Sequence, residues 1–270
     1  MEFVDKALAR RLEAAEEIPQ VNYGRLYQKL RPEIGAAVEP ICGGHMIFAG
    51  VGSPIGRTVG MGFDGTATAD DLDRMEEFYR AHGAPSQVDV CPLTDPPLLE
   101  LLKQRGYTMG ELNNVLFCRL NGERRSQVPD GFRIRAAGSE EAGRLADILV
   151  RGFFPEGNAP EGFAAMIAPL YQFEGVLPFV VEKDSELVAC GCGLVVPERG
   201  IVAMFGAATL PEYRRSGLQT ALFCSRMEAA RKAGCEYAVV VTQGGSASQR
   251  NAERLGFRVA YSKATLVKTV

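Results

Sequence analysis

The sequence has little of what several protein classes require. Only two of its 270 residues are histidines, and no uncharged run approaches the ~18 apolar residues of a membrane-spanning helix. Residues 1–12 alternate charged and apolar side chains, so they lack the apolar core of a secretion signal. A net charge of only −3 argues against nucleic acid or an anionic membrane as the main partner. We therefore expect a cytoplasmic protein that binds neither.

The seven cysteines are odd in number and scattered along the chain. Cys190 and Cys192 are two residues apart in an apolar stretch, so strand alternation places both thiols on one face. No histidine or further cysteine lies near them to complete a metal site. We therefore predict buried structural thiols and no bound metal, and we assign no role to His45 or His82.

The most informative stretch is Leu-Pro-Glu-Tyr-Arg-Arg-Ser-Gly-Leu-Gln-Thr-Ala-Leu at residues 210–222. It lies between a predicted apolar strand at 201–209 and a predicted amphipathic helix at 218–232. The N-terminus of a helix presents free N–H groups to anions, and Gly217 lets the backbone approach them closely. Arg214 and Arg215 add forked donors that suit phosphate. The stretch therefore predicts a pyrophosphate-binding loop.

Residues 214–219 resemble the acetyl-CoA loop of the GNAT acetyltransferases, which reads Arg/Gln-x-x-Gly-x-Gly/Ala. Gln219 departs from it at the last position, so its side chain either points away from the phosphates or contacts them. A predicted strand at 237–242, a helix opening near Ser246 and a closing Gly256-Phe257 follow in the order of that family, with a last strand at 265–270. The resemblance covers the chain from Phe132 onward.

The resemblance implies an α/β (α+β) fold in which helices flank a mixed, mostly antiparallel sheet, splayed where the cofactor binds. It implies acetyl-CoA as co-substrate, no metal, and transfer of the acetyl group to an amine by direct attack. Gly206 is then the expected position of a β-bulge, and the N–H of Ala207 or Ala208 the expected oxyanion donor. The implied cofactor-binding residues are Ala207, Ala208, Thr209, Arg214, Arg215, Ser216, Gly217, Leu218, Gln219, Thr220, Ser246 and Asn251.

Two catalytic groups common in the family are missing from their expected positions. The carboxylate on the fourth strand is replaced by the neighbourhood of Met204, and the tyrosine before the closing Gly-Phe by Ala252. Ser248 and Tyr261 are the candidate substitutes, and an ordered water, the first half of the chain or a partner subunit are alternatives. Tyr261 also has a plain structural interpretation as a strand residue. Ser246 and Asn251 have one as a helix cap or an exposed helix residue.

The two halves of the chain resemble each other at an offset of 150 residues, where Arg105-Gly106-Tyr107 matches Leu255-Gly256-Phe257. The match predicts a helix at 71–80, a strand at 87–91, a helix at 98–104 and a strand at 115–117. We therefore predict two GNAT-like domains, 1–127 and 128–270, joined within a polar linker at 121–130.

The position that corresponds to the basic loop is residues 63–70, which contain two acids and no arginine. Acidic side chains would repel a pyrophosphate, so the first domain is predicted to be degenerate for cofactor binding. The glycines at 43–62 include a superficial phosphate-loop pattern, but a strand is predicted at 58–63 rather than a helix. They are therefore interpreted as hairpin and bulge glycines.

The sequence thus favours a tandem N-acetyltransferase whose acceptor is a small-molecule or peptide amine. A non-catalytic acyl-CoA sensor is the alternative, because of the missing carboxylate and tyrosine. Binding of another nucleotide is less favoured, since the loop lacks the Lys-Ser/Thr pair that handles a γ-phosphate. Monomer and homodimer both remain open.

Overall fold

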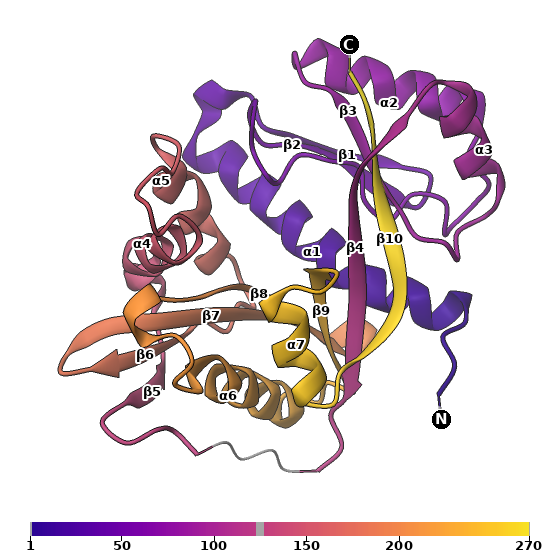
Figure 1. Ribbon diagram of the computed structural model, residues 1–270. Helices are drawn as coiled ribbons and strands as arrows, with labels where there is room; N and C mark the ends of the chain where they lie inside the picture. The colour runs from indigo at the N-terminus through magenta and orange to yellow at the C-terminus, as the bar shows by residue number, and fades with distance from the viewer. Residues whose placement is uncertain (1, 123–126, 270) are drawn as a thin grey trace. The chain divides into compact units, whose positions relative to one another are not determined.

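The computed structural model describes residues 2–122 and 127–269. They form two compact units, one of Met1–Leu116, Val241–Ser246 and Val259–Val270, the other of Phe117–Val240 and Ala247–Arg258. In chain order the helices and strands are α1 (Lys6–Leu30), β1 (Ala37–Ile41), β2 (Gly44–Phe48), α2 (Ala69–Ala81), β3 (Ser86–Val90), α3 (Pro97–Gln104), β4 (Thr108–Arg119), β5 (Arg133–Ala136), α4 (Ala142–Phe153), α5 (Phe163–Ile167), β6 (Phe179–Lys183), β7 (Glu186–Val196), β8 (Ile201–Thr209), α6 (Leu218–Lys232), β9 (Tyr237–Gln243), α7 (Ala247–Arg254) and β10 (Arg258–Lys268) (Figure 1).

The strands form a two-stranded sheet, β1-β2, and an eight-stranded sheet of order β3-β10-β4-β9-β8-β7-β6-β5. β5, β6, β7 and β8 pair antiparallel in succession, whereas β8 and β9 are parallel. This is the predicted mixed sheet with flanking helices, so the predicted fold class is confirmed. Among the described residues, no helix has the length and apolar character needed to cross a membrane.

The element orders of the two halves agree, as the internal repeat predicts. α2, β3, α3 and β4 correspond to α6, β9, α7 and β10. The last strand of the chain nevertheless belongs to the first unit, where Ala264 of β10 pairs antiparallel with Val90 of β3. The domain boundary at residue 127 stays a prediction, and residues 123–126 of the predicted linker lie outside the described residues.

The first unit is built on α1 and on an apolar cluster contributed mainly by α2, α3, β2 and β3. α1 is capped by Asp5, whose side chain accepts a hydrogen bond from the N–H of Leu8 at 2.8 Å. The β1-β2 hairpin turns at Cys42-Gly43, both with positive φ, which confirms the interpretation of hairpin glycines there.

The predicted strand at 58–63 is wrong. Only two isolated bridges occur in it, between Thr58 and Val88 and between Val59 and His45. Gly60 and Gly62 have φ values of 72° and 85°, which are incompatible with a continuous extended strand.

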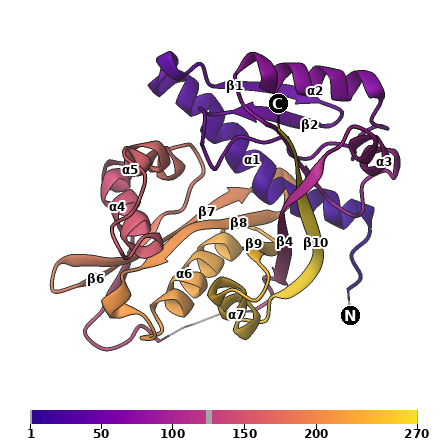
Figure 2. The same ribbon diagram turned by 45° about the horizontal axis from the view of Figure 1, so that its top comes forward.

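The second unit places α4 and α6 on opposite faces of β7 and β8 (Figures 1 and 2). Cys190 and Cys192 face the α4 side and are fully buried, which confirms the prediction for these thiols. Gly191 between them faces α6, where an added Cβ would lie 2.8 Å from Cζ of Arg226. The seven cysteines, all of them among the described residues, form no disulfide.

Candidate functional site

A β-bulge interrupts β8 where it was predicted. Cys190 pairs with Ala208 and Cys192 with Phe205, so Gly206 and Ala207 together lie opposite the single residue Gly191. Gly206 has a φ of 56°, a left-handed conformation that suits glycine. The parallel pairing with β9 ends at Met204↔Val240, although β8 continues to Thr209. The last part of β8 therefore has an edge without a β9 partner.

The bulge is held by a tyrosine that the sequence analysis did not single out. Tyr171 lies in the 3₁₀ turn Ala168–Tyr171 and is fully buried. Its hydroxyl donates a hydrogen bond to the carbonyl oxygen of Gly206 at 2.9 Å. Phe173 stacks on Phe205, with ring centroids 6.3 Å apart. Both residues therefore brace the bulge.

Replacing Gly206 by alanine should lower the free energy of unfolding by about 2 kcal/mol, because a left-handed non-glycine residue costs about 1–2 kcal/mol. The added Cβ would also lie only 3.1 Å from the hydroxyl of Tyr171. Gly52→Ala is the matched control, since Gly52 also has positive φ but no heavy atom within 4 Å of such a Cβ. Urea denaturation measures both losses, and equal losses would contradict crowding at Tyr171.

The loop after β8 leads into an uncapped helix terminus. Arg215 and Gly217 have φ values of 64° and 82°, and Gly217 is the N-cap of α6 without a side-chain cap. Alternating left-handed residues direct successive N–H groups to one side, as in anion-binding backbone turns. The N–H groups of Leu218, Gln219 and Thr220 begin the helix, where no intrahelical acceptor exists for them. This terminus thus offers several N–H groups to an anion.

The side chains of the loop divide into inward and outward groups. Gln219 turns away from the helix end, because its Nε2 donates to Oγ1 of Thr209 at 2.9 Å. Arg214 donates from Nη2 to the carbonyl of Gly152 at 2.6 Å, and the Ser216 hydroxyl donates to the carbonyl of Tyr213. Arg215 is exposed. The departure from the family pattern at Gln219 therefore serves a contact between α6 and β8.

The corresponding helix of the first half has a different N-terminus. Thr68 caps α2, and its side chain accepts from the N–H of Asp71 while the Asp71 carboxylate accepts from the N–H of Thr68. This capping box satisfies two free donors and adds Asp70 and Asp71 to the first turn. The end of α2 is thus closed and acidic, whereas the end of α6 is open and basic.

Arg226 of α6 is a buried cation next to Gly191, on the α6 side of the sheet. Its Nη1 donates to the carbonyl of Cys192 at 2.8 Å and its Nε to that of Leu222 at 3.1 Å. Among the described residues its Nη2 has no hydrogen-bond partner, and burial lowers the pKa of Arg226 to about 10. Its guanidinium fills the space that Gly191 leaves.

The other predicted ligands lie around α7. Ser248 is exposed in its first turn, and Oδ1 of Asn251 accepts from Arg254 at 3.2 Å. Ser246 precedes the helix, and its N–H donates to the carbonyl of Gln243 at 3.2 Å. Ala252 is fully buried. The roles of Ser246, Ser248 and Asn251 stay predictions.

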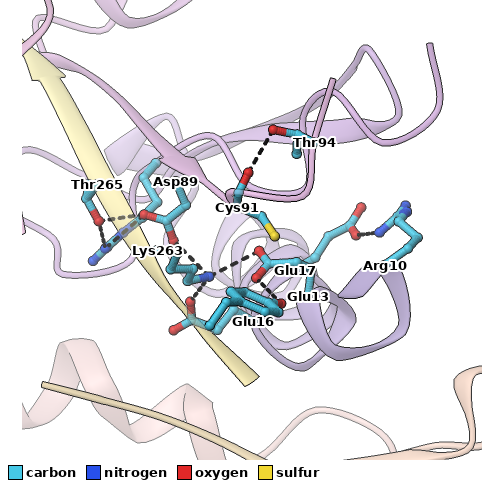
Figure 3. Close-up of polar contacts among 11 residues, drawn as sticks. Arg10, Glu13, Glu16, Glu17, Asp89, Cys91, Thr94, Lys263 and Thr265 are labelled. Carbon is cyan, nitrogen blue, oxygen red and sulfur yellow. Dashed lines mark hydrogen bonds and ion pairs between the residues drawn. The ribbon is translucent and has the colours of Figure 1, made fainter. Parts of the chain in front are cut away.

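Tyr261 belongs to a buried ionic cluster in the first unit, together with Glu13, Asp89 and Lys263. Glu16 lies at its margin, and Figure 3 labels the charged members. The Tyr261 hydroxyl donates to Oε1 of Glu13 at 2.7 Å, and burial raises the pKa of this phenol. Lys263 Nζ forms ion pairs with Glu13 at 3.2 Å, with Asp89 at 3.4 Å and with Glu16. The acid role assigned to Tyr261 stays a prediction.

The side chains of the described residues do not suggest a metal site. Within residues 2–122 and 127–269 no group of three His, Cys, Asp or Glu side chains could hold a metal ion. The polar groups at the bulge and at the loop after it are instead backbone amides, hydroxyls and arginines.

Part of the chain matches a known protein family. Residues 144–257 match the family described as Acetyltransferase (GNAT) family. No curated protein matches the chain in sequence.

Solved structures share the fold. A GCN5-related N-acetyltransferase from Kribbella flavida superposes with a TM-score of 0.67 at 16% identity, over 92% of this chain and 95% of its own. A tandem GNAT protein from the clavulanic acid biosynthesis pathway gives 0.61 at 12% identity, over 86% and 78%. A GCN5-related N-acetyltransferase from Sphaerobacter thermophilus gives 0.55 at 16% identity, over 74% and 67%. Residues 144–257 therefore match the GNAT acetyltransferase family, and the chain shares its fold with GCN5-related N-acetyltransferases.

Proposed function

We propose that this protein transfers the acetyl group of acetyl-CoA to the nitrogen of an amine. The observation that carries the proposal is the corner between β8 and α6. There, a bulged strand with a free edge leads directly into an open, basic helix terminus. A pantetheine arm can pair with the edge as an added strand, while the pyrophosphate binds the N–H groups at the start of α6.

The chemistry follows from this placement. The neutral amine attacks the thioester carbonyl, a C–N bond forms, the C–S bond breaks, and CoA leaves as a thiolate that takes up a proton. The amine must lose a proton, for which Ser248 and an ordered water are the candidates, while Tyr261 is the candidate donor to the departing thiolate. Ala207 is favoured over Ala208 as oxyanion donor, because Ala207 lies in the bulge whereas Ala208 pairs with Cys190.

Calorimetric titration with acetyl-CoA and with CoA tests the proposal. We expect one site per chain, because the N-terminus of α2 is closed by its capping box and acidic. A screen of amines with thiol detection then follows on the same protein. No binding of either compound would contradict the proposal, and binding without turnover of any amine would favour an acyl-CoA sensor.

A further inference from the structure

We propose that Tyr171 is a positioning residue for the oxyanion donor. Through its hydrogen bond to the carbonyl of Gly206, it orients and polarises the peptide group whose N–H belongs to Ala207. The inference rests on the proposed function, because it concerns the group that would receive the charge developing on the thioester oxygen.

Tyr171 can act on the N–H of Ala207 because the hydrogen-bonded carbonyl of Gly206 belongs to the same peptide group. The carbonyl of Gly206 and the N–H of Ala207 are parts of the same planar unit, so fixing one fixes the other. A hydrogen bond accepted by the carbonyl increases the polarity of the peptide and strengthens its N–H as a donor, by about 10–30% in condensed-phase estimates. The 2.9 Å hydrogen bond from Tyr171 is therefore placed to act on Ala207.

The peptide between Gly206 and Ala207 has less support from the sheet than its neighbours in β8. Neighbouring peptides of β8 are held by the ladder to β7, but Gly206 and Ala207 lie in the bulge, where the register shifts. The pairing with β9 has also ended at Met204. The tyrosine hydroxyl thus provides a fixed contact to a peptide that is outside the regular ladder.

The environment of Tyr171 keeps its hydroxyl protonated and fixed as a hydrogen-bond donor. Tyr171 is fully buried, and burial raises the pKa of its hydroxyl well above the ordinary value, so it keeps its proton. Sγ of Cys190 lies 3.9 Å from this hydroxyl and 3.8 Å from the Gly206 carbonyl oxygen, so the buried thiol packs against the same contact. Glycine at 206 leaves the room that the hydroxyl occupies.

If Tyr171 had only a structural role, removing its hydroxyl would have a different effect. Loss of its hydroxyl would change the stability of the fold and leave a bound thioester unaffected. Tyr79 provides this comparison in the first unit, since it is equally buried and its hydroxyl donates to the carbonyl of Ile47 at 3.4 Å, beside a 3.1 Å hydrogen bond with the Thr58 hydroxyl. Tyr171→Phe and Tyr79→Phe therefore remove the same group from two buried backbone contacts.

The experiment is isotope-edited infrared spectroscopy of acetyl-CoA carrying ¹³C at the thioester carbonyl, bound to each protein. The wild-type protein and Tyr79→Phe should move the carbonyl band to lower frequency by the same amount, and Tyr171→Phe should move it less. CoA affinity by calorimetry should be alike in all three. With an accepted amine, kcat of Tyr171→Phe should fall about tenfold at little change in KM, compared with roughly 10²–10³ for loss of a whole oxyanion donor.

Each other outcome has a meaning. Equal band shifts for Tyr171→Phe and the wild-type protein would overturn the role of Tyr171, as would a wild-type protein that binds acetyl-CoA without any shift. Failure of the wild-type protein to bind acetyl-CoA would instead overturn the proposed function. If Tyr171→Phe does not fold, 4-aminophenylalanine at position 171 keeps a weaker donor. The carbonyl band should then shift less than in the wild-type protein but still differ from that of free acetyl-CoA, whereas a shift equal to the wild-type value would overturn the inference.

Discussion

Replacing Lys263 by methionine is expected to lower the free energy of unfolding by about 3–5 kcal/mol, because removing one partner of a buried ion pair leaves the other charge uncompensated. The ammonium of Lys263 lies among Glu13, Glu16 and Asp89, and both Glu13 and Asp89 are almost completely buried (Figure 3). Methionine matches the length of the aliphatic stem, so the loss reports the charge. Urea denaturation monitored by circular dichroism measures it.

Lys268→Met is the matched control on the same strand. Lys268 pairs with Glu76 at 2.9 Å, but both side chains are partly exposed, so its loss should cost less than about 1 kcal/mol. Glu13→Gln combined with Lys263→Met should be less destabilising than the two single changes added together, since one buried charge is then removed with its partner. Similar losses for Lys263→Met and Lys268→Met would contradict a buried ionic cluster.

The pH dependence of the Lys263→Met variant has a defined sign. Burial already raises the pKa of Glu13, while Lys263 opposes that rise and also lowers the pKa of Asp89. Without Lys263 the pKa of Glu13 should lie still further above its value in the unfolded protein, so this carboxyl takes up a proton on folding. The variant should therefore regain stability as the pH is lowered from about 8 towards 5.

The ionic cluster shows why part of the fold could not be predicted from the sequence. Tyr261, Lys263 and Thr265 alternate with Ser262 and Ala264 in β10, and polar residues at every second position normally indicate the solvent face. Here that face is buried, because residues from α1 and β3 supply the partners. Pairing across such distances in the chain is invisible to a local pattern. The long helix α1 was missed as well, since Pro19 and buried Glu13 and Glu17 obscure its apolar stripe.

The candidate site was more accessible to sequence reasoning. β8 and α6 have the predicted bounds, because an apolar β-rich run and an amphipathic helix are separated by turn residues. The bulge at Gly206 was also predicted correctly. Tyr171 and Arg226 were not predicted. Tyr171 lies in a short 3₁₀ turn, and Arg226 has the sequence pattern of an ordinary charged helix residue, so only the structure shows its burial. No local signal identifies either residue.

Arg215→Glu combined with Gly217→Glu is expected to abolish measurable CoA binding. Charge-assisted hydrogen bonds contribute about 1.5–3 kcal/mol each, so losing two of them weakens binding about 10²–10⁴-fold, before the repulsion between carboxylates and phosphates is added. An added Cβ at Gly217 would contact only Pro129 at 3.8 Å, so the expected cost to the fold is that of the left-handed conformation. Calorimetric titration with CoA measures the effect.

The first unit offers a control with the same chemistry. Arg31→Glu combined with Gly35→Glu changes the charge equally, and Gly35 has a φ of 68° with no heavy atom within 4 Å of an added Cβ. Both double variants therefore carry one left-handed glutamate, which should cost each of them about 1–2 kcal/mol of stability. Only the variant at 215 and 217 should lose CoA affinity. Equal CoA affinity in both, with both proteins folded, would show that the terminus of α6 does not bind the pyrophosphate, and would require another part of the chain to bind the cofactor.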